Sequence, residues 1–166
     1  MRKVFLLSLL LVVLSLVIPW LVVTLSPAEE PAAQPLPSVT ASAAVAPDSE
    51  TAITALSGGA LVETTMADWL PGVVAAEMPA SFAPEALRAQ AVAARTYILQ
   101  RVRGGAANHP EAGVCDQYTC CCARKDDAAL REQWGADYAH NMTRIRQAVT
   151  DTDGQYLTYG GQLIRA

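Results

Sequence analysis

The segment from Val73 to Leu99 places the strongest constraint on the fold, because two prolines divide it into two helices. Pro79 disfavours helical backbone at the residue before it, so a first helix should end next to Glu77. Pro84 fits the first turn of a second helix without the loss of a hydrogen bond. This second helix is rich in alanine, which lets another backbone approach closely. The segment therefore predicts a corner of two packed helices.

The apolar pattern extends this corner on both sides. Thr65 followed by Asp68 has the form of a capping box and predicts that the first helix begins there. Gly104 and Gly105 predict the end of the second helix at about Arg103. The other expected elements are a hairpin of 51–56 and 60–63, helices over 126–133 and 137–150, and a C-terminal hairpin of 155–159 and 162–164. The expected fold class is α+β.

An apolar run from Val4 to Leu25 follows Arg2 and Lys3 and is long enough to cross about 30 Å of hydrocarbon as a helix. A cleaved signal peptide is the alternative, which ranks second because the run is long and no clean small-x-small site closes it. The basic residues precede the run and acidic residues follow it, so the N-terminus should stay in the cytoplasm. We therefore expect residues 1–25 to form a cytoplasmic tip and a single-pass transmembrane anchor to the cell membrane, with the rest outside the cytoplasm.

Composition divides the remainder into a linker and one domain. Residues 26–50 are rich in Pro, Ala, Ser and Thr and too poor in large apolar side chains to form a core, which predicts a disordered tether. Residues 51–166 are enough for one small domain. A net charge of −4 and a pI near 5.1 give no reason to expect a nucleic-acid partner. A glycan partner is compatible with this charge, because an uncharged sugar backbone needs no basic surface.

Two motifs of the helical corner carry a resemblance to a known family. Glu77-Met78-Pro79 and the sequence AQAVAART of residues 89–96 resemble the signature of the stage II sporulation protein D family (SpoIID/LytB domain). The similarity extends from about Leu61 to Ala166. It implies a membrane-anchored peptidoglycan lytic transglycosylase of spore-forming bacteria, and a helix-rich first half of such a domain followed by a β-hairpin.

Glu77 is the catalytic residue that this resemblance implies. Breaking a glycosidic bond needs a proton on the leaving oxygen, which a carboxylic acid supplies only where its surroundings disfavour the charged form. Glu77 shares the helical side of Leu70 and Val73, which predicts burial, and the carbonyls at a helix C-terminus repel a carboxylate. On the residues alone, a solvated carboxylate or one paired with Arg88 is more common.

The resemblance also implies how the reaction proceeds and where the substrate binds. A lytic transglycosylase protonates the glycosidic oxygen, takes a proton from the C6 hydroxyl of N-acetylmuramic acid and leaves a 1,6-anhydro end, so one carboxylate suffices. Gln90, Arg95 and Arg88 are the candidate substrate-binding residues, since an Arg side chain can hold a carboxylate through two hydrogen bonds. Salt bridges or plain solvation of these side chains are equally compatible with the sequence.

The resemblance further implies partners and a second interpretation. Relatives act during engulfment alongside a peptide-removing amidase and a membrane scaffold protein, which are the expected partners besides peptidoglycan glycan strands. The family domain normally continues past the hairpin that ends at Ile164, so the chain is expected to be truncated. A non-catalytic wall-binding or amidase-enhancing module is therefore the alternative function.

One histidine and four cysteines gather within fourteen positions, His109, Cys115, Cys120, Cys121 and Cys122. The spacing of six residues from the histidine to Cys115, and again to Cys121, permits a tetrahedral zinc site. Disulfides are the alternative for an exported chain, but three consecutive cysteines pair poorly. The resemblance favours zinc, because some family members carry the pattern His-x5-Cys-x5-Cys in this loop. We expect such a zinc ion to hold the loop rather than to take part in the reaction.

Overall fold

The computed structural model describes Leu6, Ser8, residues 13–15, 17–18, 20–21, 46–105 and 107–164. The chain divides into two units, Met1–Ser42 and Ala43–Ala166, which are considered separately. In the first unit the described residues are helical. No helix among the described residues is long and apolar enough to cross a membrane, and a span needs about 20 helical residues. The prediction of a transmembrane helix over residues 4–25 is therefore wrong. Residues 26–45 of the predicted tether lie outside the described residues.

The second unit begins with a small mixed sheet. Strands β1 (Ala52–Ser57) and β2 (Ala60–Thr65) form an antiparallel hairpin, as expected. Gly58 and Gly59 make its two-residue turn with φ of +58° and +83°, a conformation that favours glycine. The short strand β3 (Val114–Cys115) then pairs in parallel with the other edge of β1, which gives the order β2-β1-β3. This pairing brings the cysteine loop to the sheet.

The predicted helical corner is confirmed by α2 (Met66–Glu77) and α3 (Pro84–Gly104). The Thr65 hydroxyl accepts a hydrogen bond from the Asp68 backbone N–H at the start of α2. Met78 leaves the helical conformation with φ −139° and ψ 134°, immediately before Pro79. The local signals for capping and for proline thus set the helix boundaries.

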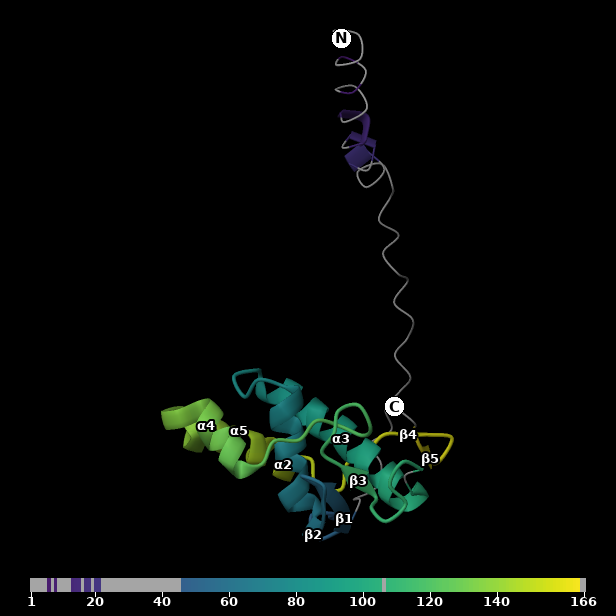
Figure 1. The fold of residues 1–166 in the computed structure, drawn as a ribbon, viewed down its shortest axis with the longest axis vertical. Coiled ribbons are helices and arrows are strands. Elements are labelled where there is room, and N and C mark those ends of the chain that lie inside the picture. The colour runs from purple at the N-terminus through teal and green to yellow at the C-terminus, as the bar shows by residue number, and fades with distance from the viewer. Residues whose placement is uncertain are drawn as a thin grey trace. The chain divides into compact units, whose positions relative to one another are not determined.

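Two further helices complete the helical layer, α4 (Asp127–Trp134) and α5 (Tyr138–Asp151), joined by the 3-10 turn η1 (Gly135–Asp137). Each of α2, α3 and α5 packs against the other two (Figure 1). Leu87, Ala91, Ala94 and Ile98 of α3 are buried in this core at the predicted spacing. The chain then forms the short hairpin of β4 (Thr158–Tyr159) and β5 (Gln162–Leu163), which lies on the opposite side of the domain from α4 (Figure 1).

Gly72 explains how the segment before α4 reaches α2. A Cβ atom at Gly72 would lie 2.5 Å from the Lys125 carbonyl oxygen and 3.1 Å from Cγ of Arg124. Because glycine has no such atom, the two backbones come close enough for the Lys125 N–H to donate to the Gly72 carbonyl at 3.2 Å. The contact fixes Lys125 beside the last turns of α2.

Candidate functional site

Glu77 lies at the C-terminal end of α2 and lines a groove of about 290 Å³. The residue is exposed. Among the residues that the structure describes, its carboxylate has no hydrogen bond and no ion pair. A carboxylate with no partner in the protein is available to a ligand in the groove.

The expected burial of Glu77 on the apolar side of α2 is wrong. Leu70 and Val73 are buried as predicted, with at most 1% of their surface exposed, whereas Glu77 is exposed. The helix ends at Glu77 and the chain turns away through Met78 and Pro79, so the last side chain stands at the mouth of the groove instead of in the core. The alternative pairing with Arg88 is not found either, because Arg88 contacts Glu85 and Asp151.

Sequence reasoning missed four other residues that line the groove with Glu77: Lys125, Gln133, Trp134 and Asn141. The Gly72 contact places Lys125, whose ammonium group donates to Gln133 Oε1. Trp134 ends α4 and Asn141 lies in the first turn of α5. These residues come from separate elements about fifty to sixty positions after Glu77, and no spacing in the sequence links them to it.

Arg95 lies in the core, with only 1% of its surface exposed. Its Nε is 3.0 Å from Asp48 Oδ1, and its Nη2 donates to the Val149 carbonyl at 3.0 Å. Its Nη1 donates to the carbonyl and hydroxyl oxygens of Thr152. This guanidinium therefore connects α3 to the end of α5 and to the segment before β1, rather than facing the Glu77 groove.

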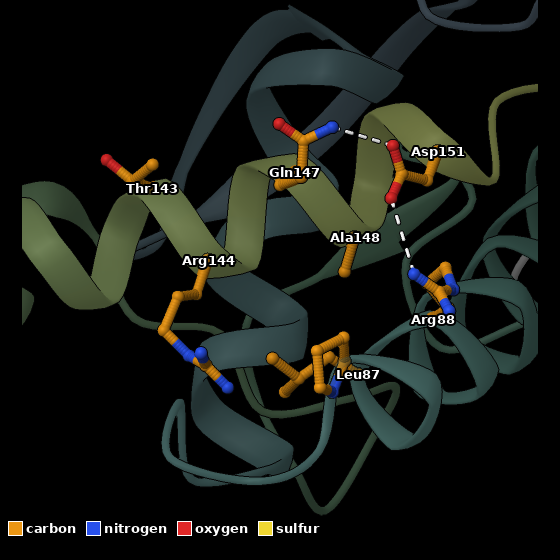
Figure 2. A pocket seen from close by; sticks show the side chains of 8 residues that line it. Leu87, Arg88, Thr143, Arg144, Gln147, Ala148 and Asp151 are labelled. Atoms are coloured by element: carbon orange, nitrogen blue, oxygen red, sulfur yellow. Dashed lines mark hydrogen bonds and ion pairs between the residues drawn. The ribbon is translucent and has the colours of Figure 1, made fainter.

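Arg88 and Gln90 also lie apart from that groove. Gln90 is half-buried on α3 and does not line it. Arg88 lines a different cavity of about 240 Å³ between α3 and α5, with an apolar floor that includes Leu87 and Ala148. Figure 2 shows Arg88 directed at Asp151, which also accepts a hydrogen bond from Gln147. The structure thus does not bring the three predicted substrate-binding residues together with Glu77.

The cysteine loop forms a compact cluster of metal-ligand types. One potential ligand atom each of His109, Cys115, Cys120 and Cys121 lies within 4.8 Å of the other three. In a tetrahedral zinc site with Zn–S bonds of about 2.3 Å, sulfur ligands lie about 3.8 Å apart, so these spacings fit the ion after a small contraction. All four cysteines of the chain are free thiols. The donor set suits a metal ion.

The histidine of this cluster is oriented as metal-binding histidines are. Its Nδ1 lies 2.9 Å from the Ala112 carbonyl and its Nε2 lies 3.1 Å from Cys121 Sγ. Because a carbonyl only accepts, the proton of a neutral His109 stays on Nδ1 and the lone pair of Nε2 faces the thiols. Burial acts to lower the pKa of His109, but the hydrogen bonds to Cys121 and Ala112 outweigh it and raise the pKa to about 9.

The thiols of the loop differ in their acidity. Burial raises the pKa of Cys115 to about 12. Burial also acts to raise the pKa of Cys121, but its hydrogen bonds with His109, Cys115 and Tyr97 together outweigh burial, and the pKa is lowered. These shifts favour an imidazolium–thiolate pair of His109 and Cys121, and a cation bound there would replace the proton.

The Cys122 thiol is affected by charges of both the cysteine cluster and the Glu77 groove. Its thiol pKa is raised to about 12, by burial first and then by the negative charges of Cys121 and Glu77. The half-buried Cys122 packs against the hydrophobic core. The charge of Glu77 thus acts on a thiol that follows the cluster directly in the sequence.

Comparison with known families covers both sites. The sequence model of the family described as Stage II sporulation protein (SpoIID) matches residues 57–159. The chain belongs to this family. The matched range includes every residue that lines the Glu77 groove and the whole cysteine cluster.

Two curated relatives have the same family name. The chain is 42% identical over 100 residues to stage II sporulation protein D of Bacillus amyloliquefaciens, and 43% identical over 100 residues to that of Bacillus subtilis (strain 168). Each alignment covers 60% of this chain and 29% of the relative. The chain thus spans less than a third of the length of these SpoIID proteins, and it is a sporulation protein by family.

Proposed function

We propose that this SpoIID-family chain cleaves peptidoglycan glycan strands as a lytic transglycosylase, with Glu77 as its single acid and base. The supporting observation is that the Glu77 carboxylate stands in a groove without a partner among the described residues. A carboxylate held in an ion pair would have to lose that partner before it could exchange protons with a substrate. A glycan strand bound in the groove would shield Glu77 from water and so supply the surroundings that disfavour the charged form of a general acid.

The proposed reaction balances without water. Protonated Glu77 donates its proton to the glycosidic oxygen as the bond from that oxygen to C1 of N-acetylmuramic acid breaks. The C6 hydroxyl oxygen of the same sugar then bonds to C1, and the carboxylate of Glu77 accepts the hydroxyl proton. The product carries a 1,6-anhydro end, and Glu77 returns to its protonated state. A second carboxylate, which most glycoside hydrolases need, has no role in this reaction.

Product analysis tests this proposal. Purified protein incubated with amidase-treated glycan strands should release fragments that are lighter than the hydrolysis products by one water, as measured by mass spectrometry. Fragments with ordinary reducing ends would point to a hydrolase instead. A second candidate function is a non-catalytic wall-binding or amidase-enhancing module. Such a module would cosediment with cell wall and release no fragments.

The proposed substrate also determines location and partners. Peptidoglycan lies outside the cytoplasmic membrane, so this domain would act outside the cytoplasm. Amide-linked peptides crowd the glycan of intact wall, and an amidase that removes them would expose the strands to the Glu77 groove. We therefore propose an engulfment amidase and its membrane scaffold as functional partners.

For the cysteine cluster we propose a structural zinc ion bound by His109, Cys115 and Cys121, with Cys120 as the fourth ligand. A set of one imidazole and three thiolates fills all four positions of a tetrahedral site, which is typical of structural zinc. The loop is already tied to its surroundings, because Arg101 donates to the Cys120 carbonyl at 3.1 Å and the Asp116 N–H donates to the Leu56 carbonyl. Bound zinc would lock the loop between α3 and β1.

Elemental analysis checks the zinc proposal. Protein purified under reducing conditions should contain about one zinc per chain, and Cys121→Ser should lose most of it. The matched control is Cys122→Ser, because Cys122 lies outside the group of four ligand atoms, and this variant should keep its zinc. Metal-free protein in which all four cysteines form disulfides would contradict the proposal.

A further inference from the structure

The groove that Glu77 lines also contains a large aromatic ring. Trp134 lines the groove and is half-buried, with part of its indole packed against the hydrophobic core. Its ring centre lies 6.3 Å from that of Tyr138, at an interplanar angle of 41°. These contacts hold the indole in place while part of it faces the groove. An aromatic ring held this way offers a flat apolar surface to a ligand at little cost in entropy.

Polar groups beside this ring lack partners. Asn141 lines the same groove and is half-buried, yet its side-chain amide has no hydrogen bond among the described residues. An amide offers two donors and a carbonyl acceptor, and those of Asn141 are therefore open to a ligand in the groove. Lys125 donates a hydrogen bond to the side-chain oxygen Oε1 of Gln133, whereas the Nε2 group of Gln133 has no partner within the described part of the chain. Two neutral amides are thus available next to an aromatic surface.

This combination matches the chemistry of a pyranose ring. One face of such a ring presents C–H groups, which pack on an aromatic surface, while its edge carries hydroxyls that both donate and accept hydrogen bonds. An N-acetyl substituent adds one amide N–H and one carbonyl, the complement of an Asn side chain. A protein partner would be recognised instead through a larger apolar patch or through charge pairing. Beside Trp134 the groove offers neutral amides, and the Lys125 ammonium group that also lines it already donates to Gln133.

We propose that Trp134, together with Asn141 and Gln133, forms a binding subsite for one N-acetylated pyranose ring next to the bond that Glu77 would cleave. The proposal rests on the proposed function for the identity of the ligand, but it does not require cleavage. Glu77 at the end of α2 and Trp134 at the end of α4 line the same groove. Trp134 is therefore a substrate-binding residue, and Glu77 alone exchanges protons.

Binding of a defined glycan tests the subsite apart from catalysis. In the Glu77→Gln background, a tetrasaccharide of alternating N-acetylglucosamine and N-acetylmuramic acid should bind about tenfold more weakly after Trp134→Ala. Trp134→Phe keeps an aromatic surface and should retain most of the affinity, which also guards against an alanine variant that fails to fold. Tyr159→Ala is the matched control, because Tyr159 is 87% exposed on β4, away from α4. Its affinity should equal that of the background.

A spectroscopic readout locates the sugar directly. The indole N–H resonance of Trp134 should shift on addition of the tetrasaccharide, whereas that of Trp69, which is 1% exposed in the core, should not. Binding without a shift at Trp134, or with unchanged affinity after Trp134→Ala, would overturn the subsite and leave the role of Glu77 standing. Binding through Trp134 without release of fragments would support the subsite and refute the proposed cleavage. Absence of any binding would refute both.

Discussion

Replacing Glu77 with Gln is expected to lower the release of 1,6-anhydro ends by about 10²- to 10⁴-fold, the usual contribution of a general acid and base. Gln has nearly the same shape as Glu but neither donates a proton to a leaving oxygen nor accepts one from a hydroxyl. The measurement is the initial rate of fragment release from amidase-treated glycan strands. Binding of the uncleaved strands should change little, because the groove keeps its shape.

Glu77→Gln should change the chemistry of the groove without disturbing the fold. Glu77 is exposed and has no hydrogen bond or ion pair within the described part of the chain, so no folding contact is lost. The free energy of unfolding of Glu77→Gln should therefore stay within about 0.5 kcal/mol of the unsubstituted protein. Glu50→Gln is the control, because Glu50 is an exposed turn residue before β1. A Glu77→Gln protein that keeps more than a tenth of the activity would remove Glu77 from the mechanism.

Local signals in the sequence predicted the helices well. Prolines 79 and 84, the capping pair of Thr65 with Asp68 and paired glycines act over three or four residues, so their structural effect depends little on the rest of the fold. The three-stranded sheet was only half predicted, because β3 is two residues long and pairs with β1 about sixty positions earlier. Such a strand has no pattern of its own in the sequence.

The candidate site was less predictable because it is assembled from distant segments. Glu77 and the cysteine cluster were found from short motifs, but Trp134 and Asn141 reach the groove only through the packing of α4 and α5. Arg95 was named from its motif, but its position in the core was not predicted. It follows Ala91 by four residues on the buried side of α3, yet the family resemblance and its guanidinium group suggested a ligand contact. Its partner Asp48 lies in a segment whose composition indicated a tether, so no sequence pattern joined the two.

Replacing Arg95 with Met is expected to reduce the free energy of unfolding by about 3–5 kcal/mol, the usual cost of removing one partner of a buried ion pair. Met fills much of the volume but offers no donors, so the Asp48 carboxylate and the carbonyls of Val149 and Thr152 lose their common partner. Because domains of this size are stable by only about 5–15 kcal/mol, much of the stability would be lost. Chemical denaturation followed by circular dichroism measures the change.

The pH dependence separates an ion-pair effect from a packing effect. Burial raises the pKa of Asp48, followed by its hydrogen bond with Asp153, whereas the charge of Arg95 lowers it. Without Arg95 this pKa rises further. A carboxyl group whose pKa is raised in the folded state lowers the free energy of unfolding as the pH rises. The destabilisation by Arg95→Met should therefore be smaller at about pH 4 than at pH 7. A loss that is independent of pH would mean that Arg95 contributes by packing alone.

A matched substitution on the same helix completes the test. Arg88→Met removes a partly exposed guanidinium whose nearest carboxylates are Glu85 at 2.9 Å and Asp151 at 3.5 Å, and exposed pairs contribute only about 0–1 kcal/mol. The double variant Arg95→Met with Asp48→Asn should recover part of the stability lost by Arg95→Met, because it removes the unpaired buried charge. If Arg88→Met were as damaging as Arg95→Met, or if the double variant recovered nothing, the buried pair would not be what ties α3 to the end of α5.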